Sequence, residues 1–533
     1  MRISLILLPL AAAMPPSDFA PNSLVRRHCV EPKNCGATIQ GTMCNFCCAK
    51  DVKPDSTHCK SANAACQAGG KPDDFLSGGF GIDKHSSHPT SGCLQWLQSI
   101  VFKALSKNPN TFPPILKNIL FGYIYPAFFG RSLGITVDGI GSRVKTLNQL
   151  ATVQAKLATI PHEEWNHDVD NHIDIVISPD QVSSVESFGL DYRTLHRDLG
   201  ESIAAESQVH TAYKRDINDL SWFDSYHSYT DHVQYFTDLH EAFPGNSELV
   251  YSGRSFENRT IHGIHLFGDE GPGKPAVLYH GTVHAREWIA APLINAHKNA
   301  TNASDSILNQ HDFHIFPIVN PDGFTFSQEV DRLWRKTRTP PPLNSTCYGT
   351  DINRNWEYGW DANPFGASTN PCAQSYRGQK PSDTIENQGL DAYVRKLRDT
   401  SRVKLYIDWH SYGQYILSPF GSKETWYAPE LGKWTKTASV LSEVIRDSSE
   451  RRTTFTFGPS GATLYTTTGA APDHVYAIGG ADFSYTIELP DTGDFGFVLP
   501  PDRILGAAEE QWEGQQVLYT LLDEVFFDGI GAA

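Results

Sequence analysis

The stretch AVLYHGTVHARE, residues 276–287, joins a short apolar run to a group of possible metal ligands. An apolar run of this length between loops is typical of a strand that is buried on both faces. His284 and Glu287 follow the run, and a His and a Glu three residues apart can bind one cation where a loop turns into a helix. The pair alone is a weak signal, because such spacings occur by chance and each histidine can equally be a hydrogen-bonded core residue.

Two more apolar runs, residues 404–409 and 485–489, alternate with helical patterns over residues 386–397 and 507–527. This alternation predicts a three-layer α/β/α domain with a mixed central sheet and a functional site at the strand ends. His410 directly follows the run 404–409. It is well placed to be a third ligand, because a catalytic zinc site has three protein ligands and one position for water.

The bulk composition of the 533 residues is that of a globular protein, with 40% hydrophobic and 20% charged residues, and the length suggests more than one domain. The formal net charge of −16 repels phosphate backbones, so we expect no nucleic-acid partner. No apolar run approaches the roughly 20 residues that cross a bilayer, so no transmembrane segment is expected.

Residues 1–13 predict a secretory signal peptide, because Arg2 precedes a short apolar core and small residues end it. The alternative is a frayed apolar terminus. A secreted, extracellular protein would also accept glycans at its Asn-x-Ser/Thr sequons. These sequons are at Asn258, Asn299, Asn302 and Asn344.

Eight of the ten cysteines lie between Cys29 and Cys93, within a leader of unknown fold that we assign to residues 14–132. Such density after a signal peptide favours a disulfide-stapled module, although eight cysteines allow 105 connectivities. A zinc ribbon at Cys44 and Cys47 is less favoured, because no second pair follows at a suitable distance.

Residues 133–210 mix helical and strand patterns and predict a small α+β open sandwich. Lys214-Arg215 follows this unit and is either a processing site between two domains or an ordinary solvated charge pair. The expected elements are helices over residues 143–157 and 195–207, a strand over 173–177 and a helix start at Pro179.

From about residue 133 to the C-terminus, a series of motifs resembles the carboxypeptidase A family of zinc exopeptidases, and their order is that of the family. This resemblance implies a catalytic domain over residues 216–530, preceded by an inhibitory pro-domain at 133–210. The motifs are HAREW (284–288), NPDGF (320–324), RLWRKTR (332–338), DINRNW (351–356), HSY (410–412) and ELPDTG (488–493).

The resemblance implies that His284, Glu287 and His410 hold one Zn²⁺ per chain, since that family is a known case of a His₂Glu zinc site. It implies that Asp351 accepts a hydrogen bond from the second ring nitrogen of His284; the alternative is a turn-forming Asp. Glu488 would be the general base, and the alternative is a structural carboxylate at a strand end.

The remaining roles also follow from the resemblance. Arg335 would stabilise the developing oxyanion, whereas a lone Arg in such a run is more often a solvated residue. Asn353 and Arg354 would clamp the substrate's terminal carboxylate, which separates an exopeptidase from an endopeptidase. The other expected substrate contacts are Tyr465, Ser411, Tyr412 and Arg286. For Arg286, an ordinary surface charge beside the metal ligands is nearly as good an interpretation.

The family's disulfide matches Cys347 and Cys372. Uncharged residues match its side-chain pocket, which implies apolar or aromatic terminal residues as the preferred substrate. Relatives that cut after Lys or Arg carry an acid at the position of Pro472 or Gly421; Asp473 lies one place later and leaves a basic preference open. The pocket residues are Leu417, Gly421, Ser460, Thr467, Ala470, Pro472 and Thr486.

We therefore expect a secreted metallocarboxypeptidase zymogen that hydrolyses the C-terminal bond of peptides and proteins with a free C-terminus and is inhibited by its own pro-domain. The alternative is a catalytically impaired relative that binds zinc and acts as a binding module. The leader 14–132 is not part of the usual precursor; it is either a carbohydrate- or surface-binding module or a segment misassigned to the chain.

Overall fold

The computed structural model describes residues 2–5, 135–138, 153, 155–166, 172–190, 192–208, 213–291 and 307–523. All of them belong to one compact unit, residues 1–11 together with 129–533. The leader 14–132, most of the predicted helix 143–157 and the sequons at Asn299 and Asn302 lie outside the described residues.

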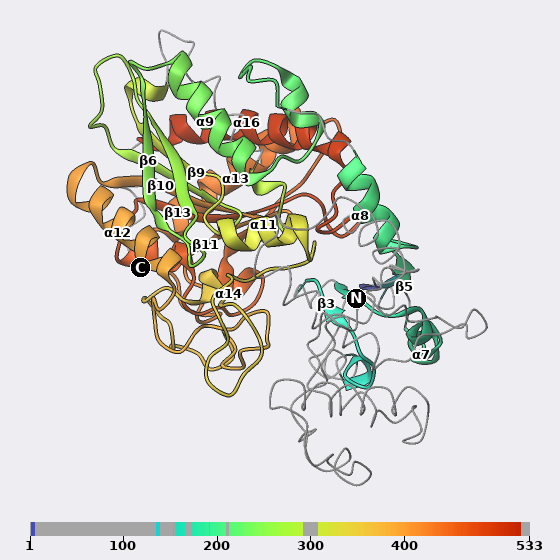
Figure 1. Ribbon diagram of the computed structural model, residues 1–533. Coiled ribbons are helices and arrows are strands. Elements are labelled where there is room, and N and C mark those ends of the chain that lie inside the picture. Colours follow the sequence, from blue (N-terminus) through green and yellow to red (C-terminus); the bar gives the residue numbers. More distant parts are fainter. Residues whose placement is uncertain are drawn as a thin grey trace, which may run out of the picture. The chain divides into compact units, whose positions relative to one another are not determined.

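A mixed sheet of eight strands forms the centre of the larger domain, in the order β12-β11-β13-β10-β8-β9-β7-β6 (Figure 1). Its middle strands, β13, β10, β8 and β9, run parallel to one another, whereas β6, β7 and β11 pair antiparallel. The strands are β6 Ser247–Arg254, β7 Thr260–Leu266, β8 Ala276–Gly281, β9 Asp312–Phe316, β10 Val403–Ser411, β11 Tyr415–Ser418, β12 Thr456–Pro459 and β13 Phe483–Leu489.

Helices cover both faces of this sheet. Alternate residues of a strand face opposite sides, and in the buried strands the residues of both sides are apolar and pack against helices. Val277 and Tyr279 of β8 join the core that includes α9, α13 and α16, whereas Ala276 and Leu278 join the core that includes α12 and α15. The three-layer prediction is confirmed. The helices are α9 Tyr229–Ala242, α11 Pro321–Glu329, α12 Ile385–Thr400, α13 Leu431–Ser448, α14 Ser460–Thr463, α15 Ala471–Ala477 and α16 Ile504–Leu521.

Side-chain caps mark where two of the long helices begin. Ser228 caps α9 in a reciprocal capping box with Asp231, and the Thr384 hydroxyl accepts a hydrogen bond from the Asn387 N–H at the start of α12. These bonds satisfy amide groups that a first helical turn leaves unpaired. Among the described residues, no helix is long and apolar enough to cross a membrane.

A second, five-stranded sheet has the order β2-β5-β1-β4-β3. Its helices, α7 Val182–Ser187 and α8 Leu199–Gln208, lie close to the elements expected from the sequence. Strand β1 comprises residues that we assigned to the signal peptide, and removal of that peptide stays a prediction. The strands are β1 Arg2–Leu5, β2 Ile135–Asp138, β3 Glu163–Glu164, β4 His172–Val176 and β5 Tyr192–Thr194.

Candidate active site

The candidate site lies at the carboxyl ends of three neighbouring parallel strands, β8, β10 and β13. His284 and Glu287 follow β8, and His410 is near the end of β10. In the register between β10 and β13, His410 pairs with Glu488. His284 and His410, 126 positions apart in sequence, therefore meet at the carboxyl ends of the strands, where open α/β sheets bind their ligands.

Three buried side chains, His284, Glu287 and His410, bring one ligand atom each to a common point. The Nδ1 atom of His284 lies 2.8 Å from Glu287 Oε1, and His410 Nδ1 lies 3.1 Å from His284 Nδ1 and 3.0 Å from Glu287 Oε2. Two imidazole nitrogens and a carboxylate are a donor set that zinc takes in catalytic sites. The residues present therefore fit a zinc ion.

Carboxylates lie beside the outer nitrogens of both imidazoles. Asp351 Oδ1 is hydrogen-bonded to His284 Nε2 at 3.1 Å, and Asp408 Oδ2 lies at ion-pair distance, 2.9 Å, from His410 Nε2. Such partners fix the ring orientation and raise the basicity of a metal-binding histidine. Sequence reasoning missed Asp408, although a carboxylate inside the apolar run 404–409 was a signal that could have found it.

Arg335 lies beside this cluster, with Nη2 donating to Asp351 Oδ2 at 3.0 Å and Nη1 3.7 Å from Glu287 Oε1. Burial raises the pKa of Asp351, but Arg335 and His284 outweigh it and hold that pKa well below its usual range. Glu488 behaves in the opposite way, because burial raises its pKa to about 8 although His410 and Arg335 oppose the shift.

One cavity is lined by the cluster and by most of the predicted substrate contacts, including Asn353, Arg354, Ser411, Tyr412 and Tyr465. The Arg354 guanidinium is held by the Asn353 carbonyl at 2.7 Å and by the Tyr465 hydroxyl at 3.3 Å. Asn353 accepts from the Ala471 N–H at 2.7 Å through its Oδ1, and its Nδ2 lies 3.2 Å from His410 Nε2.

Six of the seven residues predicted for the side-chain pocket line this cavity, namely Leu417, Ser460, Thr467, Ala470, Pro472 and Thr486. Gly421 does not line it; a side chain there would collide with Thr467. The Gly421 N–H instead donates to both oxygens of Asp473, at 2.9 and 3.2 Å. Burial raises the pKa of Asp473 to about 7 although this hydrogen bond lowers it.

The segment before the catalytic domain reaches the same cavity, which Trp165 and Asn166 help to line. Arg286 does not line the cavity; its Nη1 donates to Glu163 Oε1 of this segment at 3.1 Å. The hydroxyl of Tyr412 donates to Asp174. These contacts were not predicted from the sequence.

A second contact between the same segment and the catalytic domain is almost fully buried. Arg332 donates to Glu206 Oε2 at 2.6 Å and to Glu206 Oε1 at 2.9 Å, and the two side chains are 2% and 1% exposed. An apolar cluster surrounds the contacts, with Val176, Leu199 and Ile203 packed against Leu333, Phe497 and Val498.

The predicted disulfide between Cys347 and Cys372 is present and closes the loop between them.

Comparisons with known proteins agree with this geometry. Residues 232–514 match the family model described as zinc carboxypeptidase. A metallocarboxypeptidase A of Trichophyton rubrum is 38% identical over 376 residues, which are 68% of this chain and 87% of the relative. A metallocarboxypeptidase A-like protein of Trichophyton verrucosum is 37% identical over 366 residues, 66% of this chain and 85% of the relative.

Among solved structures, thrombin activatable fibrinolysis inhibitor matches with a TM-score of 0.64 and 25% identity, over 71% of this chain and 97% of that chain. The chain therefore belongs to the zinc carboxypeptidase family, whose members are hydrolases that use Zn²⁺.

Proposed function

We propose that this zinc carboxypeptidase removes single apolar or aromatic residues from the free C-terminus of peptides and proteins, and that it is secreted as a zymogen. The observation that carries the proposal is one cavity lined by the His284–Glu287–His410 cluster, by Glu488 and by Arg354. The three metal-binding side chains, a candidate general base and an arginine that can bind a terminal carboxylate therefore lie within reach of one substrate.

The proposed chemistry divides between the metal and this chain's own residues. His284, Glu287 and His410 would hold the zinc ion, which when bound would supply a Lewis acid for the scissile carbonyl and the attacking water. Glu488 accepts the water's proton and delivers it to the leaving amine. Burial raises the pKa of Glu488, which makes its carboxylate a stronger proton acceptor than an exposed one.

Charge that develops on the carbonyl oxygen is stabilised by Arg335. Its guanidinium is 12% exposed and is held in place by Asp351, so little reorganisation is needed when the charge appears.

Substrate selection begins with the terminal carboxylate, which Arg354 and Asn353 bind, and Tyr465 closes over the bound end. An internal peptide bond offers no carboxylate, so Arg354 would remain unpaired in a closed pocket. The catalytically impaired alternative is disfavoured, because Glu488, Arg335 and Arg354 all line the cavity.

The preference for apolar or aromatic residues rests on the six uncharged residues that line the predicted side-chain pocket and on the state of Asp473, which also lines the cavity. Its carboxyl group is engaged by the Gly421 N–H, and its pKa of about 7, raised by burial, leaves it only partly ionised at neutral pH. It is therefore a weak partner for a Lys or Arg side chain.

The zymogen proposal rests on the contacts of residues 153–208. Trp165 and Asn166 line the cavity that would receive the substrate, and Glu163 pairs with Arg286, an expected substrate contact, so this segment would compete with a bound peptide. Cleavage near Lys214-Arg215 would separate this inhibitory segment from the catalytic domain. Secretion is supported by the disulfide and by two sequon asparagines, Asn258 and Asn344, that are exposed and open to glycans.

The test is release of C-terminal Phe, Leu, Lys and Arg from blocked dipeptides by the chain cleaved near Lys214-Arg215. Substrates with an amidated C-terminus are the matched control, because they differ only in the group that Arg354 binds. Release of Phe or Leu that amidation abolishes is expected. Preferred release of Lys or Arg would overturn the pocket assignment, and equal cleavage of amidated substrates would overturn the carboxylate clamp.

A further inference from the structure

A second group of buried metal-binding side chains lies on strands β7 and β9. His265 and His314 are directly opposite one another in the antiparallel register, and Asp312 is two residues before His314 on the same face. All three are buried, with exposed fractions of 7%, 5% and 1% for His265, His314 and Asp312. One ligand atom from each lies within 4.8 Å of the others.

The cluster is separate from the zinc site. Asp312 and His314 stand at the beginning of β9, whereas the zinc site follows the ends of the parallel strands β8 and β10. The two sites therefore lie at opposite edges of the sheet.

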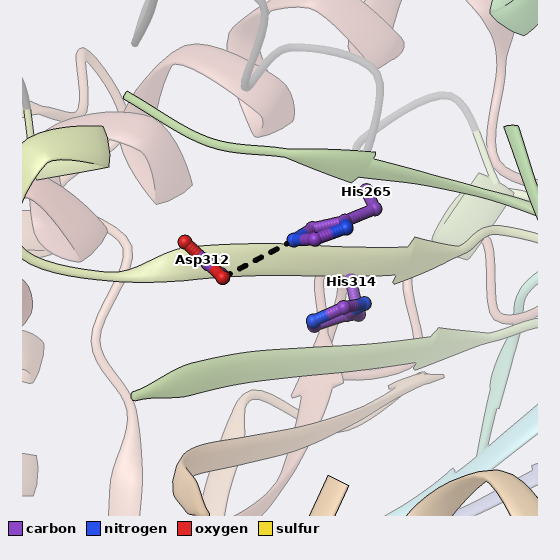
Figure 2. A group of neighbouring side chains, drawn as sticks. All are labelled: His265, Asp312 and His314. Atoms are coloured by element: carbon purple, nitrogen blue, oxygen red, sulfur yellow. Dashed lines mark ion pairs between the residues drawn. The ribbon is translucent and has the colours of Figure 1, made fainter. Parts of the chain in front are cut away.

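One unpartnered polar atom within the cluster points to a ligand. Asp312 Oδ2, the carboxylate oxygen that faces the rings (Figure 2), accepts from the Gly273 N–H at 2.7 Å. His265 Nε2 is buried without a hydrogen-bond partner and lies 3.3 Å from Asp312 Oδ2. Figure 2 shows the His265 ring directed at this carboxylate. Buried polar atoms are rarely left unsatisfied in native proteins, so His265 Nε2 calls for an explanation.

Neighbouring oxygens lie at the Nδ1 atom of each imidazole and leave the Nε2 atoms available to a metal ion. His314 Nδ1 lies 2.8 Å from the Tyr393 hydroxyl, and Glu248 Oε2 of the next strand, β6, lies 3.5 Å from His265 Nδ1. The same arrangement, an oxygen on one ring nitrogen and the metal on the other, orients histidines in metal sites.

We propose that His265, Asp312 and His314 form a second metal site, which binds a divalent transition cation of the zinc class and links β7 to β9. Two imidazoles and one carboxylate are the donor types that such cations select. Two carboxylates, Asp312 and Glu248, face the cluster, and the nearby Lys396 offsets only one of them. The two rings are stacked at 4.0 Å, so binding requires them to turn slightly towards a common point.

The test compares the zinc content of the full wild-type chain with that of His314→Phe after dialysis against micromolar free zinc. The readout is a difference between the two proteins, so zinc bound elsewhere in the chain cancels. Phenylalanine keeps the ring stack and removes both nitrogens. The matched control is His262→Phe, because His262 is on the same strand, β7, but outside the cluster. We expect one zinc fewer in His314→Phe and no change in His262→Phe.

Equal zinc contents in wild type and His314→Phe would overturn the proposal. If His314→Phe fails to fold, it also loses the zinc of the first site, and His265→Lys then replaces it, because lysine retains an ion pair with Asp312. A crystal of the wild-type chain gives the decision without any variant. Anomalous scattering at the zinc edge should show a peak between His265 and His314, and a peak at His284 alone would contradict the site.

Discussion

The buried ion pair between Glu206 and Arg332 allows the zymogen proposal to be tested quantitatively. Changing Glu206→Gln leaves the side chain's shape but places a neutral amide against a guanidinium that is 2% exposed. Removing one partner of a buried ion pair costs about 3–5 kcal/mol. In the variant, Arg332 still donates to the Arg286 carbonyl at 2.7 Å and the Phe497 carbonyl at 2.5 Å, and still lies over the ring of Trp288. We therefore take the lower end of this range, about 3 kcal/mol, as the cost of the substitution.

A loss of about 3 kcal/mol shifts the equilibrium between docked and undocked inhibitory segment about 100-fold towards the undocked form. The kcat/KM of the uncleaved chain should rise by that factor, up to the rate of the cleaved enzyme. The assay is release of C-terminal Phe by intact Glu206→Gln, with mass spectrometry to show that the chain is uncut. After cleavage near Lys214-Arg215 the variant and the wild type should be equally active, because Glu206 is then in the released segment.

The structure offers a matched control for this prediction. Arg193 also pairs across to the catalytic domain, with Asp494, but the two side chains are 37% and 63% exposed. Exposed pairs contribute about 0–1 kcal/mol, so Arg193→Gln should raise the activity of the uncleaved chain less than about 5-fold. Equal effects of the two substitutions, or no effect of Glu206→Gln on a folded uncleaved chain, would refute the reasoning.

Three further predictions concern pH, metal affinity and substrate binding. Burial raises the pKa of Glu163 from 4.5 to about 7 although Arg286 opposes the shift, so the docked segment binds more protons than the undocked one between these values. Inhibition should be strongest below pH 4.5 and weaken as the pH rises to 7, because the docking free energy falls by up to about 3 kcal/mol. The ratio of uncleaved to cleaved activity, measured across this pH range, reports the change. Glu163→Gln should make that ratio independent of pH. Asp408→Asn should weaken zinc affinity about 10–100-fold in a chelator competition, and an unchanged affinity would remove Asp408 from the site. Arg354→Gln should lower kcat/KM about 100-fold or more on free C-termini and leave amidated substrates unaffected, since only the former lose an ion pair; a parallel loss on both would indicate a structural role.

Three of the four middle strands were predictable from sequence because each is a buried apolar run, whereas β9, which carries Asp312 and His314, was not anticipated. Strands β8, β10 and β13 begin and end within about two residues of the apolar runs that predicted them. Strand β6, at the edge of the sheet, and its neighbour β7 were not anticipated, since burial along both strands is irregular. Helix α16 ends at Leu521, earlier than the predicted residue 527, and residues 524–527 lie outside those described.

The site was predictable only in part, because the apolar pattern of a strand does not reveal which strands lie beside it in the sheet. Placing His410 beside Glu488 needed the register of β10 with β13, which the family resemblance supplied indirectly. Asp408 carried a signal of its own, a charge within an apolar strand. Glu163 and Trp165 carried none, because their partners in the catalytic domain lie more than 100 residues away in sequence. His265 and His314 carried none either, because they meet only through the pairing of β7 with β9.

The most direct test of the central claim is the kcat of the cleaved Glu488→Gln enzyme, measured on a blocked dipeptide ending in Phe together with its zinc content. The account predicts that kcat falls about 10²–10⁴-fold while KM and the zinc content stay close to those of the wild type, because the substitution removes only the general base. A zinc-loaded, folded variant whose kcat falls less than about ten-fold would contradict the assignment of Glu488 and the mechanism built on it.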